Sequence, residues 1–311
     1  AWTNPFAYVG RRTTGNRRQR TLVHGPGWRG TVPDDVTHMI AAPGADIWII
    51  GRILVNDDDA DVALVRALQS KLEISRLDGS DAAMRVETHL NGHCVEVPSP
   101  ESYRSIVDVA LARNPPSSSE YLEWPVQEAE LAVQLPLVFD ELRAQEQPHD
   151  LGGGWAIPVT VRTNWGQDYL TRARVARNLI GALGVEEAMY PTTEVDADGM
   201  ALNGTNAYEL RFAQGADPKV GAFWSLTIYR RSDCLLVANP INRYSIGDRT
   251  PGLSHSADGN LAIRLQSVDP GPEFNWLPTP PDERFCVVLR LYQPHSDHLE
   301  YRYAYPPVRR L

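Results

Sequence analysis

Five polar side chains cluster in one short segment of the chain, and together they could bind a small molecule and act on it. The segment contributes Asn242, Arg243, Tyr244, Asp248 and Arg249. An arginine presents a planar fork of donors to a carboxylate or phosphate, whereas a tyrosine offers a phenol and an aspartate can accept a proton. We therefore predict Tyr244 and Asp248 as catalytic residues, and the two arginines with Asn242 as substrate-binding residues.

Two further parts of the chain suit the same ligand. Trp276 could form an apolar wall for a ring or a sugar, and its neighbour Asn275 offers a side-chain amide. Arg12 lies far away in the sequence, but we expect it to face the same cleft. These three residues complete the predicted substrate-binding set.

The same residues also have a purely structural explanation. Asp248 could simply pair with Arg243 or Arg249. Asn242 and Asn275 could hydrogen-bond the loop backbone, because long irregular loops need such internal partners. A binding site should instead leave at least one arginine unpaired and place the predicted catalytic side chains in an open pocket. Both interpretations stay open on the sequence alone.

Two other motifs resemble a dinucleotide site and a calcium loop, but the residues around them do not fit either site. Gly25–Gly30 satisfies the glycine pattern of dinucleotide sites, but Pro33 follows where a helix should begin, so a tight turn is favoured. The ladder of Asp57, Asp59 and Asp61 lacks the glycine and the glutamate that a calcium loop needs. Capping of a helix explains these aspartates better.

Histidine and cysteine spacing predicts no metal site. His89, His93 and Cys94 lack a fourth ligand, and His295 with His298 would form only a pair. A catalytic zinc site needs at least three nitrogen or sulfur ligands in proper geometry. The signatures of serine hydrolases, zinc proteases and phosphate loops are also absent. We therefore predict neither a metal nor a cofactor.

Charge and hydrophobicity argue against two classes of partner. The net charge of −9, from 30 basic and 39 acidic side chains, argues against nucleic acid. The arginine-rich, acid-free residues 1–30 are better explained as a solvated hairpin loop. No apolar run approaches the roughly 20 residues of a membrane span, so we expect a soluble protein.

Hydrophobic periodicity predicts strands near both ends of the chain and helices between them. The predicted strands are 20–24, 45–55, 207–212, 223–229, 235–239, 261–267 and 285–292. The predicted helices are 56–74, 126–147 with an interruption at Pro136, and 169–183. Hairpin turns are predicted at 196–199 and 257–260.

This pattern predicts a mainly β fold with helical connectors, in two β-sandwich or jelly-roll-like domains. Residues 1–75 are predicted as a partial N-terminal β domain with one helix. Residues 76–151 are predicted as a helical, proline-rich connector that ends at the glycines 152–154. Residues 152–311 are predicted as a C-terminal β domain opened by a helix.

Several runs resemble a bacterial two-domain family whose domains of unknown function are numbered twelve-fifty-four and twelve-fourteen. They are NPINRYSIGDRTPGL at 239–253, NWLP at 275–278, VVLRLY at 287–292 and, for the first domain, AWTNPFAYVGRRTTG at 1–15. The resemblance covers nearly the whole chain except residues 76–150. It implies two β-rich domains joined by helical connectors, and it leaves the reaction open.

In that family, strands that often follow a secretion signal precede the point at which this chain opens. The resemblance therefore implies that the front of the first domain is missing. A trimmed or cleaved N-terminus would explain this, and so would a second chain or fragment that completes the domain. The compartment stays open between the cytoplasm and the periplasm or secretion.

Two functional classes remain. The first is an enzyme that binds a small polar or anionic organic molecule and acts on it by acid–base chemistry in a cleft of the C-terminal domain. The alternative is a non-catalytic, ligand-binding or structural β protein. We favour the first, because an arginine-rich loop that carries an acid costs more to build than a plain turn. We expect a homo-oligomer in both cases.

Overall fold

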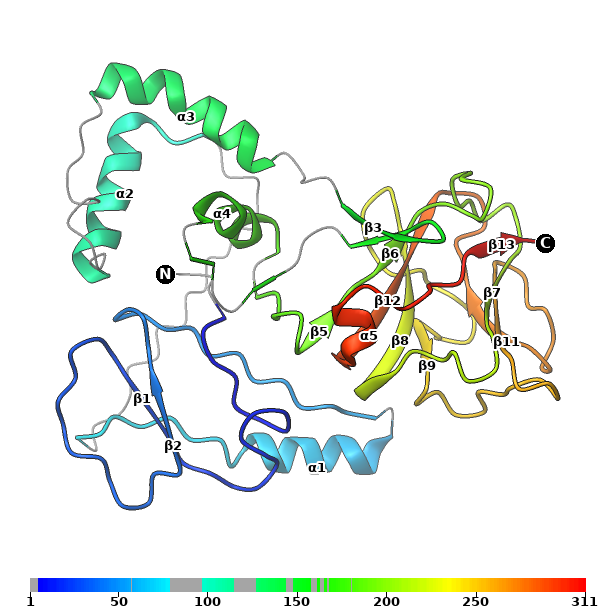
Figure 1. The fold of residues 1–311 in the computed structure, drawn as a ribbon, viewed down its shortest axis with the longest axis horizontal. Helices are drawn as coiled ribbons and strands as arrows, with labels where there is room; N and C mark the ends of the chain where they lie inside the picture. Colours follow the sequence, from blue (N-terminus) through cyan, green and yellow to red (C-terminus); the bar gives the residue numbers. More distant parts are fainter. Residues whose placement is uncertain are drawn as a thin grey trace. The chain divides into compact units, whose positions relative to one another are not determined.

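The structure is a computed structural model, and it describes residues 5–311 except 57, 79–96, 115–126, 144–147, 158–160, 163–164, 167 and 180. The chain divides into two compact units (Figure 1). One unit combines Ala1–Ala45 with Val138–Leu311, and the other spans Asp46–Leu137. The fold is mainly β, as predicted.

Two sheets build the C-terminal part of the first unit (Figure 1). The smaller has the strand order β11 (Asn275–Pro278), β10 (Leu261–Gln266), β7 (Tyr208–Phe212) and β13 (Val308–Arg310). The larger has the order β3 (His149–Gly152), β4 (Trp155–Ile157), β6 (Thr192–Thr193), β12 (Phe285–Pro294), β8 (Val220–Arg230) and β9 (Ser245–Gly247). In this larger, seven-stranded sheet, β5 (Ala188–Met189) also pairs with β12.

One hydrophobic core joins the two sheets. Alternate residues of β10, such as Leu261 and Ile263, are fully buried, and they cluster with Leu226 of β8 and Leu289 of β12. Strands that bury every second side chain in this way form a sandwich. The finer prediction of a jelly-roll topology stays a prediction.

Glycines and aspartates form the turns where their chemistry predicts them. Asp196 accepts hydrogen bonds from the backbone N–H groups of Asp198 and Met200, which closes the predicted turn at 196–199. Gly152–Gly154, all with positive φ, form the turn between β3 and β4. A Cβ on Gly153 would lie 2.5 Å from the backbone oxygen of Tyr305, so this turn needs glycine.

The N-terminal strands differ from the prediction in their pairing. β1 (Thr21–His24) and β2 (His38–Ala41) pair in parallel, so the expectation of a hairpin loop here was wrong. Gly25–Gly30 turns between them without starting a helix, as predicted. The apolar run 45–55 is not a strand in the structure, because a strand needs a ladder partner as well as β-forming residues.

The helices show both the strength and the limits of the sequence signals. Predicted helices appear as α1 (Asp59–Gln69), α3 (Glu128–Arg143) and α4 (Tyr169–Asn178), and α5 (Ser296–Leu299) is short. The Asp58 carboxylate caps α1 by accepting from the N–H of Asp61 at 2.8 Å. The predicted interruption at Pro136 was wrong, since α3 continues through it.

One helix was missed. α2 (Pro100–Arg113) lies inside the predicted proline-rich connector 76–151, at residues where no helix was predicted. Ser99 caps it, and Pro100 occupies its first turn, where a missing N–H costs nothing. No helix among the described residues is both long and apolar enough to cross a membrane.

Candidate functional site

A tight turn from Gly247 to Thr250 carries two of the predicted site residues. The Thr250 N–H donates to the Gly247 oxygen at 2.9 Å, and the Gly247 N–H donates to the Thr250 hydroxyl at 2.9 Å. A Cβ on Gly247 would lie 2.1 Å from the backbone oxygen of Trp224. Glycine therefore allows β9 to approach β8 closely enough to place Asp248 and Arg249 beside that strand.

Asp248 extends the pairing of the two strands with its side chain. Its Oδ1 accepts a hydrogen bond from the N–H of Trp224 at 3.1 Å, although the residue is exposed. Within the described part of the chain, no ion pair joins Asp248 to Arg243 or Arg249 under a 4.0 Å limit. The carboxylate thus keeps a face toward solvent while one oxygen holds the backbone.

Arg249 lies on an aromatic ring. Its Cζ is 4.5 Å from the centre of the Phe223 ring, and Phe223 in turn stacks on Tyr292 at 4.3 Å with an interplanar angle of 19°. These side chains lie on the outer face of the seven-stranded sheet, defined as the face turned away from the core, because their neighbours Trp224 and Leu291 are buried in the core. Arg249 is therefore a cation held over an apolar platform.

Arg243 serves a different part of the sandwich. Its guanidinium donates to the backbone oxygen of Trp276 at 2.9 Å, which ties the loop to β11. Tyr244 is 40% exposed, and its hydroxyl lies 3.5 Å from the Asn242 side-chain oxygen. Asn242 adopts a positive φ of 51°, which asparagine tolerates better than most residues.

Asn275 and Trp276 are buried within the protein. The Asn275 amide donates to the backbone oxygens of Ser254 and Ala262 at 2.7 and 2.9 Å, and its oxygen accepts from the Ser254 N–H at 2.9 Å. The Trp276 indole donates to the backbone oxygen of Gln266 at 2.8 Å. Both side chains satisfy internal partners, as the structural interpretation of these residues requires.

Arg12 contacts the C-terminal domain at another place. Its Nε lies 2.5 Å from a carboxylate oxygen of Glu187, just before β5. The nearby Tyr8 hydroxyl accepts from the N–H of Gly184 at 2.6 Å, and burial raises the pKa of that hydroxyl. The structure thus brings the N-terminal segment against the end of β5, whose Ala188 pairs with Tyr292.

These positions fall within segments that match known family models. The model of the DUF1254 family, described as a protein of unknown function, matches residues 1–76. The model of the DUF1214 family, described in the same words, matches residues 187–296. The chain belongs to this two-domain family. All the predicted site residues except Arg12 lie in the DUF1214 domain, and Arg12 lies in the DUF1254 domain.

Comparison with solved structures supports the fold. The crystal structure of the VPA0106 protein from Vibrio parahaemolyticus matches with a TM-score of 0.64 and 19% identity, over 97% of this chain and 77% of that chain. A crystal structure of an uncharacterized protein from Burkholderia cenocepacia gives a TM-score of 0.29 and 16% identity, over 70% of this chain and 52% of that chain. The first likeness shows the fold alone. No curated protein matches the chain.

The outer face of the DUF1214 domain also holds residues that the sequence interpretation missed. Arg290 and Tyr292 of β12 lie beside Phe223 and Tyr229 of β8 on this face. Alternation in the run 285–292 could have placed Arg290 and Tyr292 on one face, opposite the buried Leu289 and Leu291. Their neighbours on β8 could not be predicted, because the sequence of one strand does not determine its register with another.

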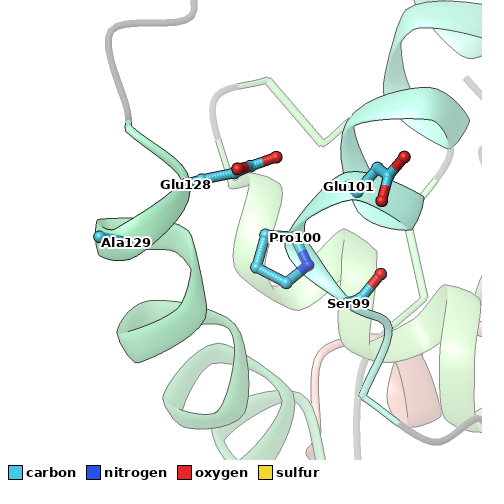
Figure 2. Close-up of a pocket in the computed structure, with 5 residues that line it drawn as sticks. All are labelled: Ser99, Pro100, Glu101, Glu128 and Ala129. Atoms are coloured by element: carbon cyan, nitrogen blue, oxygen red, sulfur yellow. The ribbon is translucent and has the colours of Figure 1, made fainter.

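A pocket of about 390 Å³ lies in the unit Asp46–Leu137 (Figure 2). It is lined by the first turns of α2 and α3, where Glu101 and Glu128 project beside Pro100. Acidic side chains favour the first turn of a helix because of its dipole. Helix stability therefore explains these glutamates without a ligand.

Among the described residues, no three histidine, cysteine or acidic side chains lie close enough together to hold a metal ion. His89, His93 and Cys94 lie outside the described residues. His298 is fully buried, and its Nδ1 lies 2.9 Å from the Tyr305 hydroxyl. Burial lowers the pKa of His298 to about 4, so the ring is neutral near pH 7.

Proposed function

We propose that this protein binds a small anionic organic molecule on the outer face of its DUF1214 domain. The observation that supports this most directly is the Arg249 guanidinium, which lies on Phe223 and has no carboxylate within 4.0 Å among the described residues. Arginine is suited to hold a carboxylate or phosphate in two parallel hydrogen bonds. An unpaired cation beside an apolar ring favours a ligand with both features.

The aromatic neighbours narrow the class of ligand. Phe223 and Tyr292 form a partly buried stack, and Tyr190 meets Tyr292 edge-on at 6.5 Å. Binding sites for small organic molecules combine such apolar surfaces with a few fixed polar groups. A flat or aromatic carboxylate fits this combination better than a sugar or an inorganic ion does.

Acid–base chemistry by Asp248 and Tyr244 is the finer part of the proposal. Asp248 lies next to Arg249 in the chain and keeps an exposed carboxylate while Oδ1 holds the Trp224 N–H. Tyr244 offers an exposed phenol on the same loop. A ligand anchored by Arg249 would place its reactive atoms within reach of the turn that carries Asp248.

A structural role is the second candidate, and a different observation favours it. Asn275, Trp276 and Arg243 all bond to backbone groups inside the sandwich. For these three residues we propose a stabilising role in the DUF1214 domain. The proposed ligand site then depends on Arg249 and the aromatic stack.

Thermal unfolding in the presence of small anions tests the proposal. At equal ionic strength, an aromatic carboxylate such as benzoate should raise Tm more than phosphate or chloride does, because only benzoate can use the ring platform. Arg249→Ala should remove this excess. Arg310→Ala is the matched control, since Arg310 is also exposed but lies on β13, and it should keep the excess. A cooperative transition with no excess for any organic anion would reject the proposal.

A further inference from the structure

Arg290 lies in the middle of β12 on the outer face of the seven-stranded sheet. It stands opposite Ser225 of β8, and Tyr229 follows further along β8 on the same face. Its guanidinium donates a hydrogen bond to the Tyr229 hydroxyl, and its Cζ is 5.7 Å from the centre of the Tyr229 ring. The charge is thus held against the sheet instead of extending into water.

No acid among the residues that the structure describes balances this charge. In the described part of the chain, no carboxylate lies within 4.0 Å of Arg290, and its buried Nε has no hydrogen-bond partner. A partly buried charge without a counterion lowers stability, because its lost hydration is not replaced. The fold therefore maintains an unfavourable group at this position.

A second arginine in the same domain shows the usual arrangement. Arg264 of β10 also lies over an aromatic ring, Phe274, at 4.8 Å, and its Nε is also buried without a partner. Unlike Arg290, Arg264 has an ion pair, with Glu209 at 3.4 Å. The two arginines differ mainly in this carboxylate, which pairs with Arg264 and has no counterpart at Arg290 among the described residues.

We propose that Arg290 and Tyr229 form a separate anion-binding position that takes a small carboxylate or phosphate group. The guanidinium supplies a fixed fork of donors. Because the Tyr229 hydroxyl accepts from Arg290, its own proton is available to a ligand oxygen. This position lies on the same face as Arg249 but does not depend on it, since Arg249 sits on Phe223, six residues along β8 from Tyr229.

Thermal unfolding of the full chain with phosphate, acetate and chloride at equal ionic strength tests this inference. Phosphate or acetate should raise Tm by several degrees over chloride, and the response of each ion shows which group the position prefers. Arg290→Met should remove that rise and leave Tm in chloride at least as high as in the wild type. The removal of an unpaired charge explains both results.

Two controls separate this position from general effects. Arg264→Met should lower Tm in chloride, because it removes one of the two ion pairs of Glu209, and it should keep the rise with phosphate or acetate. Arg290→Lys keeps the charge without the fork and should weaken the rise even if the methionine variant does not fold. Arg310→Ala, which removes an exposed charge on β13, should leave the rise unchanged. A rise that survives in Arg290→Lys at full size, or no rise in the wild type, overturns the inference and leaves the benzoate test of Arg249 standing.

Discussion

At the scale of single residues, the predicted site contains groups with quite different environments. Asn275 and Trp276 satisfy their polar atoms inside the sandwich, while Arg249 and Asp248 remain exposed at its edge. Residue type alone cannot separate these cases, since an asparagine and an arginine suit a loop as well as a ligand. The environment separates them, and it can be tested one side chain at a time.

Asp248 is best tested with two substitutions. Asp248→Asn keeps an oxygen that can accept from the Trp224 N–H, so Tm should change little, whereas Asp248→Ala should lower stability by about 1 kcal/mol through the lost hydrogen bond. If Asp248 acts as a base, Asp248→Asn should abolish turnover of a carboxylate substrate that binds at Arg249. Full turnover in the asparagine variant would exclude that role.

His298 should make stability depend on pH. Its pKa of about 4 in the folded protein lies below the usual 6.5, because burial disfavours the charged ring. Between these values the unfolded chain binds more protons, so stability is complete above pH 6.5 and falls as pH drops toward 4, by up to about 3 kcal/mol.

Urea unfolding across this pH range measures the effect. His298→Asn keeps a polar atom near the Tyr305 hydroxyl but cannot take up a proton, so its stability should fall less steeply than that of the wild type. Parallel curves for the two proteins would show that His298 does not cause the dependence.

At the scale of elements, alternation predicted the strands of the sandwich well. The bounds of β7, β10 and β12 lie within two residues of their predictions, because each strand buries every second side chain. α2 was missed, because serine and proline are common in loops as well as at the first turn of a helix, where Ser99 and Pro100 lie. The run 45–55 was predicted as a strand and is not one, because its apolar residues have no strand partner among the described residues.

The candidate site was predictable as a segment but not as a set of contacts. The turn residues at 247–250 stand out in the sequence. Their partners do not, because Asp248 bonds to a residue 24 positions away and Arg243 to one 33 positions away. Such contacts depend on strand register, which only the folded sheet defines.

Gly247 tests the importance of the close approach between β8 and β9. Gly247→Ala places a methyl group 2.1 Å from the backbone oxygen of Trp224, so the strands must separate and stability should fall by about 2 kcal/mol or more. The aromatic-carboxylate response should weaken as well, because Arg249 moves with the turn. Gly25→Ala is the control, since its added Cβ has no atom within 4 Å. Equal Tm values for the two variants would contradict this account.

At the scale of the whole molecule, family membership and the mainly β fold agree with the sequence prediction. The homo-oligomer and the predicted domain bounds remain predictions. Apolar side chains are exposed in the described part of the unit Asp46–Leu137, including Trp48 at 60% and Leu72 at 67%. Surfaces of this kind often contact another protein, which is consistent with the predicted oligomer. The proposed ligand chemistry belongs to the other unit, where two arginines share the outer face of one sheet.

The most direct test of this account is a crystal structure of the protein grown with a bromine-labelled benzoate. The bromine's anomalous signal locates the ligand without assumptions about its contacts. We expect the signal beside Phe223 and Tyr292, with the carboxylate on Arg249. A ligand bound elsewhere on the protein, with this face empty, would contradict the central claim.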